Sequence, residues 1–310
     1  MKTKKINTTI SHSIMLALAA FFWGTTFVAQ AMAGDYQGAY TFCCIRNVIA
    51  VFILIPVIKI IEKKDTTQRA PKTKEEKKSL LMGGIVTGIF LAGTAIFQQL
   101  GINMGTSAGK AGFLTACYIV FVPIIGIFLK RKCKLNVWIS VVIALVGLYL
   151  LCIKDDFSIE PNDFSVLICS LSCALQIIAI DYYVDRVTSL VRLAQLEFLV
   201  CAIIAAVPMF IIDMGQGAGG ISGWLQGFSS FEAWIPILYA AFLSSGVAYT
   251  LQIIGQKDLN PAVASLVMSL ESVFSVLAGW IVLGERMSLK EGIGCVLIFA
   301  AIILSQVKRD

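Results

Sequence analysis

The sequence contains a single histidine, and it lacks the short motifs that hold metals or phosphate groups. His12 precedes the first long apolar run, so no histidine base, catalytic triad or histidine zinc site can form within the apolar part of the chain. The nine cysteines include no Cys-x-x-Cys pair, which argues against a zinc site or a disulfide framework. The glycine-rich run from Gly215 to Gly220 is not followed by the Lys-Ser/Thr of a phosphate loop. We therefore expect no cofactor, no metal and no ATP-hydrolysing module.

Charged residues are also scarce. They make up 14% of the chain, against about 25% in soluble domains. Hydrophobic residues make up 58%, and the mean hydropathy is +0.84. This composition indicates a polytopic membrane protein, and its 310 residues are nearly consumed by apolar runs and short loops. A separate water-soluble domain does not fit.

Apolar runs of about 20 residues recur along the chain, which predicts an all-α integral membrane fold of ten transmembrane helices. The first run is too long and bulky for a signal-peptide core, so we expect it to be retained. The predicted spans are Ser13 to Ala33, Gly38 to Ile60, Leu80 to Leu100, Ser107 to Leu129, Leu135 to Ile153, Asn162 to Tyr183, Leu190 to Ile212, Glu232 to Ile253, Asn260 to Leu283 and Ser288 to Gln306.

Lysine and arginine are distributed unevenly between the predicted loops. With the N-terminus inside, 20 of the 25 basic residues lie on the cytoplasmic side. Lys154, Arg286 and Lys290 then lie outside, and Arg46 and Lys110 fall within spans. This bias predicts a multi-pass protein of the cytoplasmic membrane with both termini in the cytoplasm. The net charge of +6 is then a consequence of topology, and it gives little support to nucleic-acid binding.

The two halves of the chain are weakly similar to each other. Ala111-Gly112-Phe113-Leu114 lies about 153 positions before Ala264-Ser265-Leu266-Val267, and each string leads into a long helix, a charged break and a final helix. We expect two five-helix repeats, at residues 1–154 and 155–310. Because five is an odd number, the second repeat must be inserted upside down relative to the first. Inverted repeats of this kind are typical of transporters that bind substrate near the bilayer midplane.

Several strings along the chain resemble one family. They are FFWGTTFVAQ (residues 21–30), GTSAGKAGFL (105–114), FVPIIG (121–126), SLESVF (269–274) and LGERMS (283–288). They are similar to the EamA-type branch of the drug/metabolite transporter superfamily, and the resemblance covers essentially the whole chain. It implies ten helices in an inverted repeat and the transport of small metabolites, amino acids or drugs, usually outward. Two positions depart from the family pattern: Ser272 follows Glu271 where the family often has proline, and Asn47 follows Arg46 where it often has phenylalanine.

Glu271 is an acidic residue near the middle of a predicted span. A carboxylate at that depth is costly, and an intramembrane ionisable residue is a functional-site hypothesis by default. Two interpretations stay open. In the first, Glu271 titrates as a coupling proton site or contacts a cationic group of the substrate. In the second, it pairs with Arg46, which lies too deep in its own span to reach water easily, and holds the two halves together.

Other polar and aromatic residues within the spans are also candidates for substrate contact. Trp23 either stacks on the substrate or packs in the core, and Lys110 either faces an anion or extends to the interface. Gln195 and Glu197 are expected to be structural partners of Arg46. Uncharged polar residues in spans are often interhelical hydrogen-bond partners rather than ligand contacts. The predicted substrate-binding set is Trp23, Thr26, Gln99, Lys110, Tyr118, Gln176, Tyr249, Gln252 and Glu271.

We interpret the chain as a secondary active transporter that moves a small metabolite, amino acid or drug-like solute by alternating access, with export favoured over import. One alternative is a channel, which needs a constriction that opens to both sides at once. The other is an intramembrane enzyme, for which Asp181 lies near a helix end without a second aspartate motif. We expect a non-enzyme whose partners are a small-molecule substrate and the lipid bilayer.

Overall fold

The computed structural model describes residues 2–106, 108–131, 133–153, 160–215, 219–257, 259–283 and 288–306. Every regular element in these ranges is helical, which confirms the predicted fold class. The α-helices are α1 (Lys2–Gly34), α2 (Ala39–Lys64), α3 (Lys74–Asn103), α4 (Ala108–Ala116), α5 (Tyr118–Phe128), α6 (Leu135–Cys152), α7 (Asp163–Tyr183), α8 (Leu190–Pro208), α9 (Gly220–Gln226), α10 (Phe231–Tyr239), α11 (Thr250–Gln256), α12 (Pro261–Met268), α13 (Leu270–Leu283) and α14 (Leu289–Gln306). Two π-helical segments are η1 (Met209–Asp213) and η2 (Ala240–Tyr249).

Within the described chain, ten helical segments are long and apolar enough to cross a membrane, and they coincide with the ten predicted spans. Six of them are single helices, and the other four join shorter elements. The composite spans are α4 with α5, α8 with η1, α10 with η2 and α11, and α12 with α13. Because intramembrane breaks in a helix free backbone groups for other partners, these composite spans are the places where a site is expected.

Some helices extend beyond the predicted apolar boundary. The second span was expected to end at Ile60 and the third to begin at Leu80, but α2 continues to Lys64 and α3 starts at Lys74. A capping box explains the early start of α3: the Thr73 hydroxyl accepts a hydrogen bond from the Glu76 amide at 3.1 Å, and the Glu76 carboxylate accepts one from the Thr73 amide at 3.2 Å. Hydropathy locates the apolar section of a helix, whereas capping residues decide where it starts.

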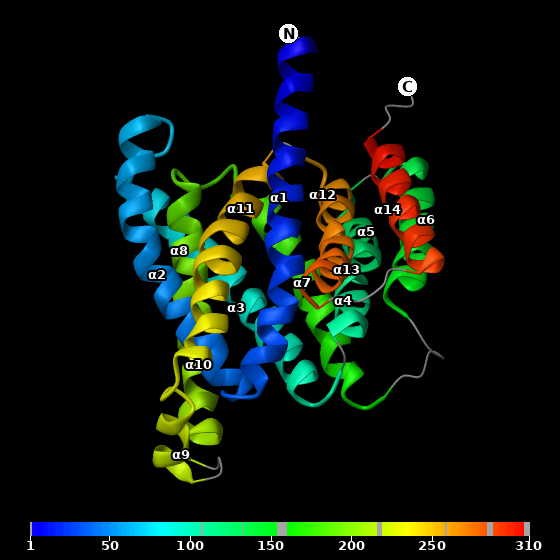
Figure 1. Cartoon of the computed structure of the whole chain (residues 1–310). Helices are drawn as coiled ribbons and strands as arrows, with labels where there is room; N and C mark the ends of the chain where they lie inside the picture. Colours follow the sequence, from blue (N-terminus) through cyan, green and yellow to red (C-terminus); the bar gives the residue numbers. More distant parts are fainter. Residues whose placement is uncertain are drawn as a thin grey trace.

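The two halves have opposite orientations along the bundle axis. Figure 1 shows α1 beginning at the upper end of the molecule and α7, the first helix of the second half, beginning at the lower end. The N- and C-termini lie at the same end (Figure 1). Each half contributes five of the ten candidate spans, so the inverted repeat predicted from the sequence is the arrangement observed.

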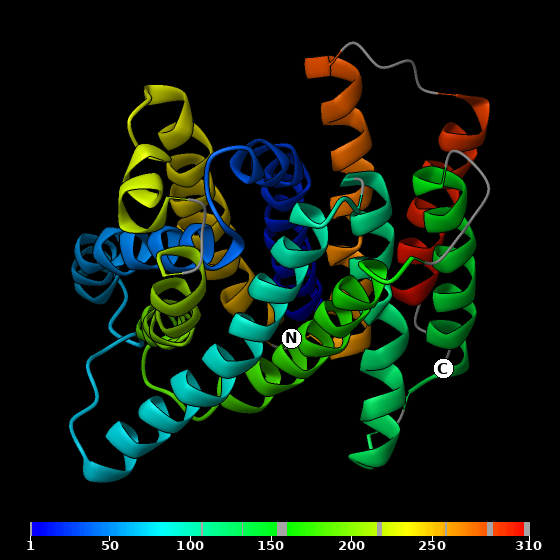
Figure 2. The same cartoon turned by 90° about the horizontal axis from the view of Figure 1, so that it is seen from below.

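Helix packing repeats between the halves with the same inversion. In the first half α4 and α5 pack on α7, and in the second half α12 and α13 pack on α1. Similarly, α3 packs along α7, while η2 and α11 pack along α1. The counterpart helices α2 and α8 pack on each other, as do α6 and α14, which lie side by side in Figure 2. Each half therefore contributes equivalent helices to both sides of the interface.

Glycines allow the closest of these approaches. At the contact between α6 and α14, a Cβ added to Gly147 would lie 2.9 Å from the Gly294 carbonyl oxygen, and one added to Gly294 would lie 2.6 Å from the Gly147 carbonyl oxygen. A Cβ on Gly24 in α1 would lie 2.5 Å from the carbonyl oxygen of Glu271 in α13. Small residues at helix contacts let backbones approach in membranes, where no hydrophobic force drives association. The position of Glu271 thus depends on Gly24.

Two of the composite spans are interrupted at equivalent places. The break between α4 and α5 falls at Cys117, and the break between α12 and α13 falls at Ser269. Neither break contains a proline. At the second, the Ser269 hydroxyl donates to the Leu266 carbonyl at 2.7 Å, a local side-chain bond of the kind that bends helices. The helix therefore breaks next to Glu271, although Ser272 stands where proline is often found in the family.

Candidate functional site

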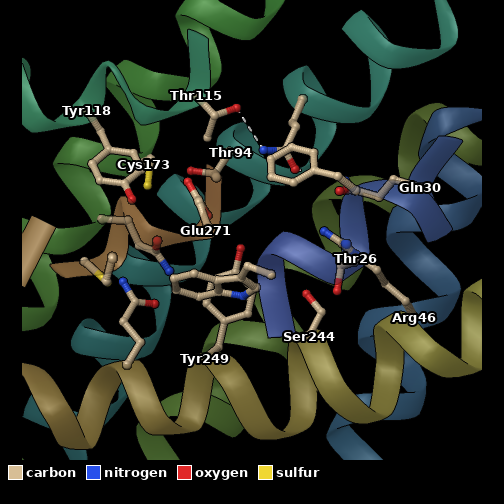
Figure 3. A pocket seen from close by; sticks show the side chains of 16 residues that line it. Thr26, Gln30, Arg46, Thr94, Thr115, Tyr118, Cys173, Ser244, Tyr249 and Glu271 are labelled. Carbon is tan, nitrogen blue, oxygen red and sulfur yellow. Dashed lines mark hydrogen bonds between the residues drawn. The ribbon is translucent and has the colours of Figure 1, made fainter. Parts of the chain in front are cut away.

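A central cavity of about 500 Å³ lies between the two halves. Residues from both repeats line it, among them residues beside both helix breaks and on η2. Figure 3 shows its 16 lining side chains. They are Trp23, Thr26, Phe27, Gln30, Arg46, Thr94, Gln98, Thr115, Tyr118, Cys173, Gln176, Ser244, Tyr249, Gln252, Met268 and Glu271.

Seven of the nine predicted substrate-binding residues line this cavity, and two do not. Gln99 is fully buried and donates to the Gln30 carbonyl at 3.0 Å and to Asn103 Oδ1 at 2.8 Å. Lys110 forms an ion pair with Asp163, with 2.5 Å between Nζ and Oδ2. These contacts tie Gln99 to α1 and Lys110 to α7, so the structure does not bring these two residues together with the other seven in the cavity lining.

Glu271 lies in the first turn of α13, directly after the helix break. The N-terminal turn of a helix presents free amide groups and a positive dipole end, which favour a carboxylate. The side chain is buried, and its Oε1 has no hydrogen-bond partner in the described part of the chain. Figure 3 shows Glu271 and Tyr118 both directed into the cavity. The Tyr118 hydroxyl is likewise buried and faces the Glu271 carboxylate.

Arg46 enters the cavity from α2 and does not pair with Glu271. The residue is 3% exposed, and no described carboxylate lies within 4.0 Å of its guanidinium group. Its Nε has no hydrogen-bond partner among the described residues, and its guanidinium carbon lies 5.2 Å from the centre of the Phe42 ring. The predicted Arg46–Glu271 ion pair is therefore absent from the described structure. In Figure 3, Arg46 and Glu271 approach the cavity from different sides.

The other predicted partners of Arg46 contact different groups. Glu197 in α8 accepts a hydrogen bond from the side-chain amide of Gln176, a cavity-lining residue in α7. Gln195 donates to the Val51 carbonyl at 3.0 Å and so ties α8 to α2. Both have the structural character expected of them, but neither pairs with Arg46. The Gln176–Glu197 hydrogen bond holds the nitrogen of the Gln176 side-chain amide. The Oε1 atom of the same amide is buried and has no hydrogen-bond partner among the described groups.

Aromatic rings form one wall of the cavity. The rings of Trp23 and Tyr249 have centroids 4.8 Å apart at an angle of 60°, and Phe198 packs behind Tyr249 at 6.0 Å. Aromatic pairs in this distance range are attractive and hold the rings in place. Trp23 therefore packs against Tyr249 and also lines the cavity, and its stacking on a substrate stays a prediction.

A chain of side-chain hydrogen bonds runs along part of the lining. Gln30 in α1 donates to Gln98 in α3 at 2.9 Å, and Gln98 donates to Thr115 in α4 at 3.0 Å. The sequence analysis selected none of Gln30, Gln98 and Thr115. All three are polar residues within apolar runs, which was the available signal. Their mutual contact depends on three helices meeting, and spacing along one helix does not reveal that.

Repeat-related residues contribute to the cavity from both halves. Trp23 and Gln176 lie 153 positions apart, as do Tyr118 and Glu271. This is the same offset that relates the two similar strings Ala111–Leu114 and Ala264–Val267. The first half supplies an aromatic side chain where the second supplies an amide or a carboxylate. The cavity is thus built on equivalent positions but is chemically asymmetric.

Comparison with known proteins agrees with this architecture. The sequence model of the EamA-like transporter family matches residues 11–153 and, a second time, residues 161–306. The chain belongs to the EamA-like transporter family. The resemblance noted from the sequence is therefore confirmed, and the family domain occurs once in each half. This transporter is a multi-pass membrane protein.

One relative supports the assignment, and one solved structure supports the fold. An uncharacterized transporter from Archaeoglobus fulgidus is 28% identical over 305 residues, which cover 94% of this chain and 85% of the relative. A solved crystal structure matches with a TM-score of 0.74 and 14% identity, and the match covers 96% of both chains. At that identity the crystal structure supports the fold alone.

Proposed function

We propose that this transporter is a secondary carrier that moves a small polar solute through the central cavity by alternating access, with export as its main direction. One observation carries the proposal: buried polar atoms without described partners converge on the cavity. An unsatisfied buried polar group costs about 1–3 kcal/mol, so a ligand or water must satisfy these atoms. They are Trp23 Nε1, Arg46 Nε, Tyr118 Oη, Gln176 Oε1, Gln252 Oε1 and Glu271 Oε1.

The inverted packing supports a movement between two groups of helices. One group is α1 with α10 to α13 and η2, and the other is α3, α4, α5 and α7. Toward one end of the cavity the groups are joined by the Gln30–Gln98–Thr115 chain, and toward the end that carries the termini α12 packs on α5. Rocking of one group against the other would open these contacts in turn. Such rocking around a fixed site is the usual mechanism of inverted-repeat carriers.

The proposed location is the cytoplasmic membrane, with the end that carries both termini in the cytoplasm. The basic loop between α2 and α3 lies at that same end, at the upper left in Figure 1. Positive charge concentrates on cytoplasmic loops, so the charge bias supports this orientation. Outward transport is the direction that the family resemblance implies.

A ligand screen followed by counterflow tests the carrier mechanism. Purified protein would first be screened by thermal shift against amino acids, purines and cationic drugs, since a ligand at 100 times its Kd stabilises by about 2.7 kcal/mol. Each stabilising compound would then be used, radiolabelled, in proteoliposomes loaded with the unlabelled compound. We expect saturable counterflow. A voltage-driven flux that does not saturate would instead identify a channel and overturn the proposal.

A cavity-filling variant connects that flux to the cavity. Ser244 lines the cavity and is 3% exposed, so Ser244→Leu places three extra carbon atoms at the site. Counterflow should fall at least tenfold while the variant stays monodisperse in detergent. Ser229 lies in an exposed turn, and Ser229→Leu serves as the matched control. Equal counterflow in the two variants would exclude the cavity as the route.

A further inference from the structure

We infer that Gln252 and Gln256 in α11 form the gate of this carrier at the end that carries the termini. When that end closes, their side-chain amides bind the end of α7 and the turn after it. Gln99 and Asn103 in α3 bind the end of α1 in this way at the opposite end, and they lie 153 positions before Gln252 and Gln256. This inference rests on the proposed alternating access and adds the residues that hold the second closed end.

Hydrogen bonds from α3 close the end of the molecule opposite the termini. Gln99 Nε2 donates to the Gln30 carbonyl oxygen at 3.0 Å and to Asn103 Oδ1 at 2.8 Å. Asn103 Nδ2 donates to the Gln37 carbonyl oxygen at a longer 3.5 Å. The helices α1 and α3 belong to the two different groups that would rock, and α1 ends at the lower end of Figure 1. These bonds therefore have to break when the outer end opens.

The equivalent residues of the second repeat lack such bonds. Gln252 and Gln256 are 1% and 2% exposed. The atoms Gln252 Oε1, Gln256 Oε1 and Gln256 Nε2 are buried without a hydrogen-bond partner among the described residues. Gln256 is the last residue of α11, as Asn103 is of α3, and α11 lies toward the end of Figure 1 that carries the termini. Within the described chain, equivalent amides are thus bonded at one end of the cavity and unbonded at the other.

The central cavity does not account for Gln256. Gln252 lines the cavity, whereas Gln256 lies one turn further along α11 and is outside the lining. A solute in the cavity can satisfy Gln252, but it leaves the Gln256 amide as it is. A buried amide without a partner is unfavourable, so its presence in a native protein requires an explanation. A second state that supplies the partner is such an explanation, and alternating access requires a second state.

The end of α7 holds groups that can receive these amides. The 153-residue offset relates the Gln30 carbonyl, which accepts from Gln99, to the Tyr183 carbonyl in the last turn of α7. In the turn after α7, the Thr188 hydroxyl is also buried without a described partner. The helix α11 packs on both α7 and α8, which lie on either side of this turn. Groups that need partners therefore lie on α11 and on the turn beside it.

The side chains at the two ends are matched in size. At the outer end a Cβ on Gly34 would lie 3.0 Å from Asn103 Oδ1, so glycine permits a close approach there. The equivalent of Gly34 in the second repeat is Val187, whose larger side chain would hold α11 further from the turn. Gln256 is one methylene longer than Asn103, and the extra length spans the wider gap. Val187 and Gln256 thus replace Gly34 and Asn103 as a pair.

Cys173 in α7 can report which end of the cavity is open. It lines the cavity (Figure 3), and the reporter protein would keep it as the single cysteine. The probe is a membrane-impermeant thiol reagent, 2-(trimethylammonium)ethyl methanethiosulfonate. Labelling would be measured in right-side-out vesicles, where the probe reaches the outer face, and in inside-out vesicles, where it reaches the face that carries the termini. We expect labelling from both faces, because the carrier visits both states.

Two variants should shift this labelling in opposite directions. Gln256→Met weakens the state that is closed at the termini, so labelling from the outer face should fall about fivefold, as expected for the loss of a net hydrogen bond. Gln99→Met weakens the state that is closed at the outer end, so labelling from the outer face should rise. Gln306→Met, at the exposed end of α14, is the matched control and should leave labelling from both faces unchanged.

Thermal unfolding in detergent, with all native cysteines present, is the second measurement. Gln99→Met removes two hydrogen bonds of this structure and should lower the unfolding temperature. Gln256→Met replaces an amide that lacks described partners with an apolar side chain, so its unfolding temperature should be unchanged or higher. A residue that only stabilises the fold would instead lower the unfolding temperature when substituted. A lower unfolding temperature for Gln256→Met would therefore contradict the gate.

A compensating pair and the native reporter complete the test. Gln256→Asn should lower labelling from the outer face as Gln256→Met does, and adding Val187→Gly should restore it. If Gln256→Met is labelled as the Gln306→Met control is, or if it shifts labelling in the same direction as Gln99→Met, the gate assignment is overturned. In that case labelling of the native reporter from both faces would still support the carrier. Labelling of the native reporter from one face only would overturn the carrier and the gate together.

Discussion

Substituting Gly24 by alanine is expected to separate α1 from α13 and distort the cavity. A Cβ at this position would lie 2.5 Å from the Glu271 carbonyl oxygen, 2.7 Å from Phe274 Cβ and 2.8 Å from the Ser275 amide nitrogen. Two of these three atoms belong to backbone, and real Cβ contacts are rarely below 3.0 Å. The helices must therefore move apart by about half an ångström or more. Overpacking of this kind typically costs about 1–3 kcal/mol.

The distortion has a specific consequence for the cavity. Gly24 is adjacent to Trp23, and its Cβ would press on the first turn of α13, which carries Glu271. The side chains of Trp23 and Glu271 both line the cavity, so the added methyl group should shift the aromatic wall of the cavity relative to Glu271. Ligand affinity should fall by more than the loss of thermal stability alone predicts. The assay is thermal unfolding in detergent with and without ligand, followed by counterflow in proteoliposomes.

Gly112→Ala is the matched control. Gly112 lies in α4 near α13, but its added Cβ would meet only Ser272 Oγ, at an ordinary distance of 3.9 Å. Alanine is also the better helix former, by about 0.8–1.0 kcal/mol. This variant should unfold at the same temperature as the native protein or slightly higher. If Gly24→Ala matched it in both stability and ligand affinity, the close approach of α1 and α13 would not shape the site.

Three further predictions concern individual charged and reactive groups. Glu271→Gln should abolish transport or remove its pH dependence between pH 5 and 8. Normal transport across that range would exclude Glu271 as a proton site. The control Glu75→Gln makes the same change at an exposed position and should behave as the native protein. Lys110→Gln should lower the free energy of unfolding by about 1.5–3 kcal/mol, because it leaves the buried Asp163 without its ion-pair partner. Ligand affinity should not change. A loss of binding free energy as large as the loss of unfolding free energy would place Lys110 in the binding site. The third prediction concerns a variant that keeps Cys133 as its single cysteine. Burial raises the pKa of this thiol, so less thiolate is present at pH 7, and maleimide labelling should be slower than for a free thiol and should accelerate as the pH rises toward the raised pKa. Labelling by an impermeant maleimide from the face opposite the termini would contradict the proposed topology.

The two breaks in the spans illustrate a limit of sequence reasoning. Ser272 follows Glu271 where the family often has proline, which removes one source of a kink, yet the span breaks at Ser269. A hydroxyl that bonds back to its own helix bends it without a proline, and the equivalent break at Cys117 has no proline either. The composition of a helix permits such a break. Packing against the opposite repeat determines whether the break is used.

The fate of the charged residues illustrates a second limit. Depth in the membrane identified Arg46 and Glu271 as residues that need partners, and that prediction depended only on the cost of burying charge, whereas Lys110 was expected to face an anion or to extend to the interface. It did not identify the partners. Lys110 pairs with Asp163, whereas Arg46 and Glu271 face the same cavity with no ion-pair partner among the residues that the structure describes. Partner choice is a question of three-dimensional distance between helices that are far apart in sequence.

The sequence by itself determined the class of the protein, its ten spans, the repeat and seven of the 16 residues that line the cavity. These features follow from local composition, because the energy of transferring a segment into lipid is a sum over its own residues, and an odd number of spans per repeat forces the inversion. Tertiary structure alone decided that Gln30, Gln98 and Thr115 bond to one another and that Glu197 orients Gln176. Those features depend on distances and directions between helices, which no property of a single segment contains.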